Sequence, residues 1–87
     1  MHPITVMVQA AVRAVTDEGQ ITEVREHLGE RHLVIEVQAA STRAAGLVIG
    51  KHGETITAIR HVATRGGKKY RPVLNVSVEV VTKEEGV

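Results

Sequence analysis

Hydrophobic spacing predicts a helix near the start of the chain. Between residues 3 and 16 the apolar residues follow a 3.6-residue period and so share one face: Ile4, Met7, Val8, Ala11, Val12 and Val15. Pro3 suits the first helical turn, where its missing N–H costs nothing, and Asp17-Glu18-Gly19 ends the helix. We expect the apolar stripe to pack on the sheet, although an uncovered stripe would also suit a protein partner.

Three later segments alternate between apolar and polar residues, which is the pattern of a strand with one buried face. The clearest is 31–39, whose buried side holds Leu33, Ile35, Val37 and Ala39. Residues 73–82 repeat the pattern with Leu74, Val76, Val78 and Val80. Residues 21–28 are less regular and carry charges, which suits a sheet edge, and Gly29-Glu30 marks a hairpin between the first two strands.

Two short helices are predicted between the second and third strands. Ser41-Thr42 is a suitable N-cap pair for a helix at about 42–49. After the turn from Gly50 to Gly53, a helix at about 54–64 has its apolar residues on one side: Ile56, Ile59, Val62 and Ala63. The paired glycines of the loop 65–69 stop this helix. The order α-β-β-α-α-β predicts an α+β fold, with a three-stranded sheet and three helices on one face.

Length and composition place these elements in one domain. A chain of 87 residues has no room for a second core, so we expect the domain to cover residues 1–82 and residues 83–87 to form a flexible tail. The apolar residues are nearly all aliphatic, with one Tyr and no Phe, Trp or Cys. The absence of Cys, of a membrane-length apolar segment and of a basic leader leads us to expect a soluble cytoplasmic protein.

Charge is unevenly distributed along the chain. Residues 51–71 hold six Lys or Arg and one Glu, a net charge of +5, whereas residues 1–50 and 72–87 each carry a net charge of −2. A basic segment of this kind is typical of contact with nucleic acid. On charge alone, a solvated basic face explains the segment equally well.

The turn Gly50-Lys51-His52-Gly53 carries the clearest candidate chemistry. Glycine at both ends permits backbone angles and close approaches that a Cβ would block. The following helix begins at the turn, so its free N–H groups and the positive end of its dipole can attract a phosphate. Lys51 adds a mobile cation and His52 adds a ring that can donate hydrogen bonds. Taken by itself, the turn is also compatible with a corner between two helices that binds nothing.

Other chemistries fit the sequence poorly. The phosphate loop of nucleotide hydrolases requires G-x-x-x-x-G-K-[ST]; here the glycine spacing is one residue short, and His52 stands where a hydroxyl must hold magnesium. The five histidines show no metal-ligand spacing, and no nucleophile and base are set out as a catalytic pair. We therefore expect no metal, no cofactor and no enzymatic activity.

The run from Val48 to Ile59, V-I-G-K-H-G-E-T-I-T-A-I, resembles the signature of the K-homology (KH) domain, [IV]-I-G-x-x-G-x-x-I-x-x-[IL]. The element order is similar to that of the type II, or prokaryotic, KH fold, and the resemblance covers nearly the whole chain. Because the domain stands alone, it looks most like the small bacterial KhpA-like RNA-binding proteins. KH domains clamp about four nucleotides with their GXXG loop.

This resemblance implies a set of RNA-contacting residues. The clamp would be Gly50, Lys51, His52 and Gly53, and the groove would be lined by Ile49 and Gly46. Thr57 and Arg60 would face the nucleic acid or its edge from the following helix, and Arg43 would flank the opposite rim. The predicted β-strand Leu33 to Ala39 would form the far wall. In the loop 65–71, Lys68 and Lys69 are further candidates for phosphate contact, and a solubilising turn explains this loop equally well. Tyr70, the lone aromatic, is expected to pack at the end of the last strand rather than to stack on a base.

The functional prediction is single-stranded RNA binding, in the role of an RNA chaperone or a post-transcriptional regulator. The alternative is a protein-interaction module that forms a homodimer or docks on a larger KH-containing protein, because the KhpA-like group is associated with both. The two functions are compatible, since a dimer would present two clamps.

Overall fold

The computed structural model describes residues 1–82, in the order predicted from the sequence. Its helices are α1 (Pro3–Ala14), α2 (Thr42–Ile49) and α3 (Glu54–Gly67), with a single 3-10 turn, η1 (Lys51–Gly53), between the last two. Its strands are β1 (Ile21–Leu28), β2 (His32–Ala39) and β3 (Asn75–Thr82). The flexible tail predicted for residues 83–87 lies outside the described residues.

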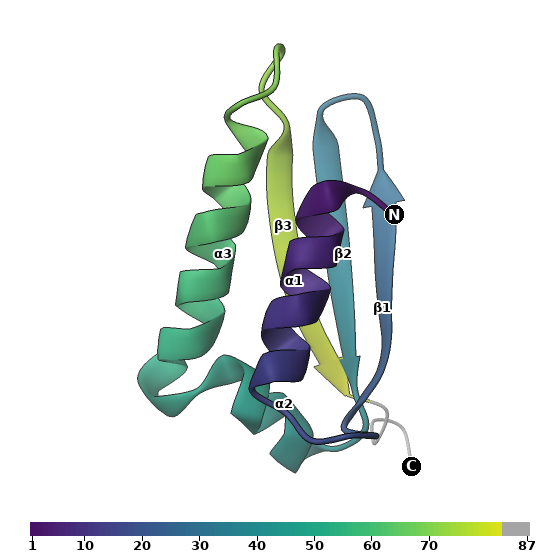
Figure 1. Cartoon of the computed structure of the whole chain (residues 1–87), viewed down its shortest axis with the longest axis vertical. Helices are drawn as coiled ribbons and strands as arrows, with labels where there is room; N and C mark the ends of the chain where they lie inside the picture. The colour runs from purple at the N-terminus through teal and green to yellow at the C-terminus, as the bar shows by residue number, and fades with distance from the viewer. Residues whose placement is uncertain (83–87) are drawn as a thin grey trace.

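The three strands form one mixed sheet in the order β1-β2-β3. Strand β1 pairs with β2 in the antiparallel sense, and β2 pairs with β3 in the parallel sense. The parallel pairing requires a long crossover, which α2 and α3 supply. Figure 1 shows α1 and α3 side by side over one face of the sheet, with α2 at its end, so the predicted arrangement of helices on one face is confirmed.

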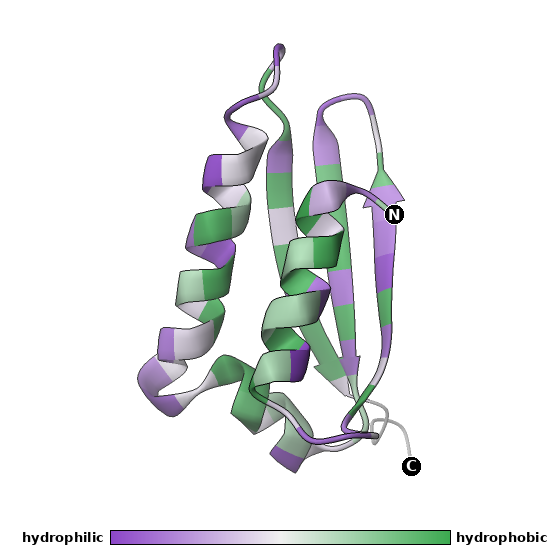
Figure 2. Cartoon of the chain, viewed as in Figure 1, coloured by the Kyte–Doolittle hydropathy of each residue, from purple (hydrophilic) through white to green (hydrophobic). Residues whose placement is uncertain are grey.

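The core lies between this sheet face and the helices, and it is aliphatic as predicted. The alternation of β2 is complete: Leu33, Ile35, Val37 and Ala39 are fully buried, whereas the residues between them are half-buried on the other face. The same alternation of apolar and polar residues is visible along the strands in Figure 2. From α1, Ile4, Val8 and Val12 enter the core. The apolar stripe of α1 is therefore packing surface, as we expected, although Val15 lies beyond the helix and is exposed.

The end of α3 differs from the prediction. The paired glycines were expected to stop the helix at about residue 64, but α3 continues to Gly67. Gly67 is buried where α3 meets the start of β3, and a Cβ on it would collide with the Leu74 carbonyl oxygen and lie 3.0 Å from Val76 Cγ2. The glycine therefore serves close packing between a helix and a strand. Pro72 has no N–H for a ladder, and β3 begins only at Asn75.

Within the described residues, no helix combines the length and the apolar character that a membrane span requires. The same residues contain no group of three His, Cys, Asp or Glu side chains placed to hold a metal ion.

Candidate nucleic-acid interface

The turn between α2 and α3 is built from unusual backbone angles. Positive φ values occur at Gly50 (79°), His52 (56°) and Gly53 (74°), and Gly53 is the N-cap of α3. The Gly50 N–H donates to the Gly46 carbonyl at 2.8 Å and the Gly53 N–H donates to the Gly50 carbonyl at 3.1 Å. The chain therefore makes a compact, hydrogen-bonded corner rather than a continuous helix.

Glycine is required at the two ends of the corner for different physical reasons. A Cβ on Gly50 would overlap the Thr55 hydroxyl and lie 2.8 Å from Thr55 Cβ, so this position combines a positive φ with a close approach to the first turn of α3. A Cβ on Gly53 would meet nothing within 4 Å. Gly53 is therefore required by its left-handed backbone alone, and it leaves open space beside the N-terminus of α3.

The two central residues of the corner are free to meet a ligand. Lys51 and His52 are both exposed. Within residues 1–82 neither side chain makes a hydrogen bond or an ion pair. The corner is thus not plugged by the protein's own side chains, and it presents one cation and one imidazole beside the positive end of α3.

On the α2 side, the predicted groove residues are accessible. Ile49 is 40% exposed although it is aliphatic, and Arg43 is exposed on the same helix. Gly46 lies in the interior of α2, and a Cβ on it would meet nothing within 4 Å. Neither packing nor a positive φ explains a glycine at this position.

On the α3 side, Arg60 connects the helix to the sheet. Its Nε donates to the Val78 carbonyl oxygen of β3 at 3.1 Å, and Thr57 is exposed one turn earlier. The strand beside α3 is therefore β3, and not the segment Leu33 to Ala39 that we expected as the far wall. That segment is the central strand β2, because β3 pairs with its free edge. The helix-side residues of β2 are fully buried in the core.

The basic loop lies at the other end of α3. Fourteen helical residues separate it from the glycine corner, which corresponds to about 21 Å at 1.5 Å per residue. Lys68 and Lys69 are exposed, and Arg71 Nη1 donates to the carbonyl oxygens of Lys68 at 2.8 Å and Tyr70 at 2.9 Å. The structure therefore does not bring these lysines together with Lys51 at one point.

Tyr70 was expected to pack at the end of the last strand. Instead its ring lies against the ring of His2 at the start of α1, with 5.4 Å between the centroids, and the residue is 37% exposed. The sequence held no signal for this contact, because the two residues are far apart along the chain.

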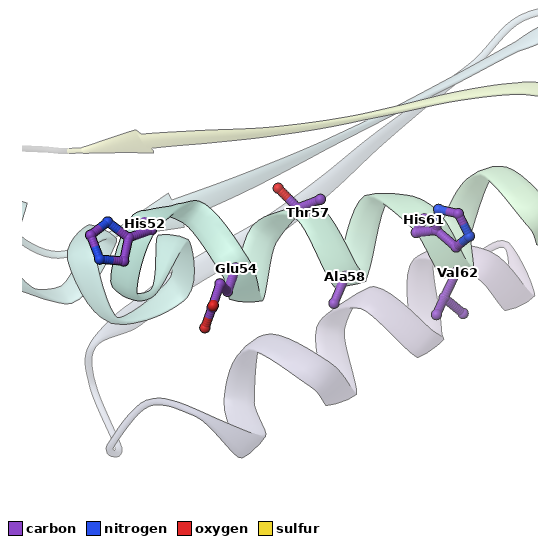
Figure 3. A pocket seen from close by; sticks show the side chains of 6 residues that line it. All are labelled: His52, Glu54, Thr57, Ala58, His61 and Val62. Carbon is purple, nitrogen blue, oxygen red and sulfur yellow. The ribbon is translucent and has the colours of Figure 1, made fainter.

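A shallow hollow of about 530 Å³ lies along exposed side chains of α3 and the corner before it (Figure 3). It is lined by His52, Glu54, Thr57, Ala58, His61 and Val62. Figure 3 shows Ala58 and Val62 on one side of the helix and Thr57 on the other. Val62 was predicted on the core side but is 54% exposed. This hollow contains His52 and Thr57 of the predicted RNA site but not Gly46, Ile49 or Arg60, so it overlaps the predicted site only in part.

Comparisons with known proteins agree with this geometry. The family model described as KhpA/KhpB, KH domain, matches residues 6–80. A search of curated proteins gave no match. Similar solved structures include a tyrosine-to-alanine variant of Aquifex aeolicus Era bound to GDP and aluminium fluoride (19% identity, TM-score 0.53, covering 92% of this chain and 31% of that chain). They also include Era in complex with MgGDPNP and nucleotides 1506–1542 of 16S ribosomal RNA (20% identity, TM-score 0.52, covering 93% and 31%).

The Era comparisons concern the fold alone, since identity is low and this chain spans about a third of the length of the Era chains. The helix and strand order, the mixed sheet and the glycine corner are those of the type II KH fold, as predicted. Because the family model covers most of the sequence, this chain belongs to the KhpA/KhpB family of KH domains, a membership that implies nucleic-acid binding.

Proposed function

We propose that this domain binds single-stranded RNA through the corner Gly50 to Gly53 and the surface that runs from it along α3. The observation that carries the proposal is the corner itself, whose positive φ values hold Lys51 and His52 exposed beside the N-terminus of a helix. A phosphate resting there would meet a helix dipole and a mobile cation together. KH domains use a GXXG loop in this way.

The dimensions of α3 suit a strand of about four nucleotides. The corner lies at its N-terminal end, Thr57 and Arg60 lie in its middle, and Lys68 and Lys69 follow its C-terminal end. A strand that followed the helix would meet positive charge at both ends of a path of about 21 Å. The middle of this path carries no Phe, Tyr or Trp, so bases would be bound mainly through their edges rather than by stacking.

The proposal that the ligand is RNA rests on the family and on one of the solved structures with a similar fold. One Era structure with this fold is a complex with 16S ribosomal RNA, and the domain presents one short clamp with no second nucleic-acid module in the described residues. A single KH domain of this kind suits the role of an RNA chaperone or a post-transcriptional regulator.

The test is the double variant Lys51→Asp with His52→Asp. Fluorescence anisotropy with a labelled single-stranded RNA should show binding by the unmodified protein and loss of binding by the variant. His27→Asp with Arg31→Asp makes the same change in charge at exposed positions of β1 and its hairpin, and it should retain most of the affinity. Circular dichroism should show that both variants keep the fold. Equal affinity in the corner variant would refute the proposal.

Self-association is a second candidate function, and the hollow on α3 favours it. Ala58 and Val62 line this outer surface, and Val62 is 54% exposed although it is aliphatic. A second copy of the chain, or a larger KH-containing partner, would cover it. The stripe of α1 is not available for this purpose, because Ile4, Val8 and Val12 are buried. Sedimentation velocity at micromolar concentration tests this function: a dimer that Val62→Asp converts to a monomer supports it, and a monomeric unmodified protein contradicts it.

A further inference from the structure

Arg60 differs from the other arginines in how it is held. Its Nε donates to the Val78 carbonyl oxygen on β3 at 3.1 Å, across the gap between helix and sheet. Arg25 forms an ion pair with Glu23, and a terminal nitrogen of Arg71 donates to two backbone carbonyl oxygens. Arg60 is thus anchored to the backbone through Nε alone. Within residues 1–82, its two terminal nitrogens make no hydrogen bond or ion pair.

This anchoring leaves a defined set of donors. A guanidinium carries five N–H groups in a rigid plane, and the bond to Val78 uses the one on Nε. The two terminal nitrogens form the opposite end of the plane, with two parallel N–H groups that suit a pair of acceptors. Because Arg60 is exposed and has no carboxylate partner among the described residues, this end is available to a ligand at full charge.

We propose that Arg60 reads a guanine base in the bound strand, an inference that rests on the RNA-binding function proposed above. Guanine presents two acceptors, O6 and N7, at the spacing of two parallel N–H donors, and this is the most common specific contact of arginine with a base. Adenine keeps N7 but places an amino donor where guanine has O6, so it opposes a second donor. In a single strand this edge of the base is accessible.

The position of Arg60 favours a base over a phosphate as its ligand. Lysines flank the path at both ends, Lys51 at the corner and Lys68 and Lys69 beyond the helix, and they suffice to bind the backbone. Arg60 lies between them, fixed against the outer strand of the sheet. A guanidinium can also bind a phosphate through two parallel hydrogen bonds. Only at a base, whose acceptors have fixed directions, would a guanidinium held at one angle make the affinity depend on which base is bound.

The test uses eight-nucleotide RNAs of uridine with one guanosine, moved through the four central positions, and fluorescence anisotropy at fixed salt. At one of these positions, replacing the guanosine by adenosine, or by 7-deazaguanosine, which lacks N7, should weaken binding to the unmodified protein by about 5- to 100-fold. Arg60→Lys keeps the charge. This variant should bind the RNAs with guanosine, adenosine and 7-deazaguanosine at that position with similar affinity. Arg65→Lys, on the same helix and exposed, should keep the preference for guanosine.

Each alternative outcome overturns the inference in a different way. An unmodified protein that binds all three RNAs equally refutes guanine reading and leaves RNA binding intact. If Arg60→Lys still prefers guanosine, another residue recognises this base. If all three RNAs bind Arg60→Lys more weakly by the same factor, and Arg60→Gln also lowers the dependence on salt, Arg60 contacts a phosphate. No binding to any RNA refutes both this inference and the proposed function. Because the modified base is tested on the unmodified protein, the result does not depend on the folding of the variant.

Discussion

At the scale of single residues, three glycines near the corner are glycine for three different reasons. Gly50 has a positive φ and a close neighbour in Thr55, so the fold requires it twice. Gly53 has a positive φ in open space, so the fold requires its backbone alone. Gly46 has neither, and it lies inside a helix, where glycine costs about 0.5–1 kcal/mol relative to alanine. The glycine at 46 is therefore a disadvantage to the fold, and close approach of a ligand would account for it.

Gly46→Ala separates these contributions. We expect the free energy of unfolding to rise by about 0.5–1 kcal/mol, because the helix gains a better residue without a clash. We expect RNA affinity to fall, because the added methyl group occupies the surface where the strand approaches α2. Urea denaturation and fluorescence anisotropy on the same preparation measure both. A variant that is more stable and binds RNA unchanged would remove Gly46 from the groove.

Gly53→Ala provides the contrast at the same scale. An alanine at a φ of 74° is strained by about 1–2 kcal/mol, so this variant should be less stable, although the added methyl group meets nothing. The two substitutions add the same group at positions seven residues apart along the chain. Opposite signs in urea denaturation would show that backbone angle, not space, sets the requirement at the corner.

At the scale of elements, the sequence predicted what depends on local spacing. The alternation of β2 identified its buried residues, and the motif identified the corner. The period of α1 identified Ile4, Val8 and Val12 but not the buried Thr5. The end of α3 was missed because glycines usually end a helix, whereas Gly67 is set by the approach of Leu74. The far wall of the groove was assigned to β2 for a related reason. The order of strands depends on pairing between β2 and β3, and no local pattern reports it.

The junction of α3 and β3 gives a prediction for the paired glycines. Gly67→Ala would push a methyl group into the Leu74 carbonyl, which is backbone and cannot move away cheaply. We expect a loss of about 1–3 kcal/mol, the usual cost of overpacking. At Gly66 the nearest atoms are the flexible end of Ile4, at 3.3 Å, so Gly66→Ala should be close to neutral. Thermal unfolding of the two variants tests the difference, and equal stability would contradict this account of the helix end.

The contact between α1 and β1 gives a prediction with pH. The Glu26 carboxylate accepts a hydrogen bond from the His2 N–H at 2.9 Å. The buried Thr5 hydroxyl makes no hydrogen bond of good geometry, but it faces Glu26 closely enough to be the largest influence on that carboxylate. Thr5 first, and then the His2 N–H, hold the pKa of Glu26 below its usual value of 4.5. The ionised carboxylate is therefore favoured in the folded state.

A depressed pKa stabilises the fold above the unfolded value and loses this effect as the pH falls through the folded value. Glu26→Gln should therefore lower the urea midpoint at pH 7. The difference from the unmodified protein should shrink below pH 4.5, first as Glu26 of the unfolded chain becomes protonated and then as the pH falls through the lower pKa of the folded carboxylate. Glu30→Gln, in the exposed hairpin, is the matched control. A difference that stays constant from pH 7 down to about pH 3 would show that the ionised form contributes nothing.

At the scale of the whole molecule, charge is divided between two surfaces. The helix-free face of the sheet carries Glu23, Glu36 and Glu79, and Glu36 on β2 pairs in register with Glu79 on β3. Arg25 on the same face is paired with Glu23. The lysines at both ends of α3 are unpaired within the described residues. A phosphate chain is thus repelled from the open sheet and attracted to the helix side, which orients the domain before contact.

This division makes the salt dependence of RNA binding a measure of the path of the strand. For single strands, the logarithm of affinity falls with the logarithm of salt by about 0.7 for each phosphate that is neutralised. If the strand runs from the corner to the basic loop, Lys51→Gln and Lys68→Gln should each reduce this slope by about 0.7, and the double variant by about twice that. Glu79→Gln, which changes charge on the open sheet, should leave the slope unchanged. If Lys51→Gln reduces the slope but Lys68→Gln does not, the bound RNA strand ends before the C-terminus of α3.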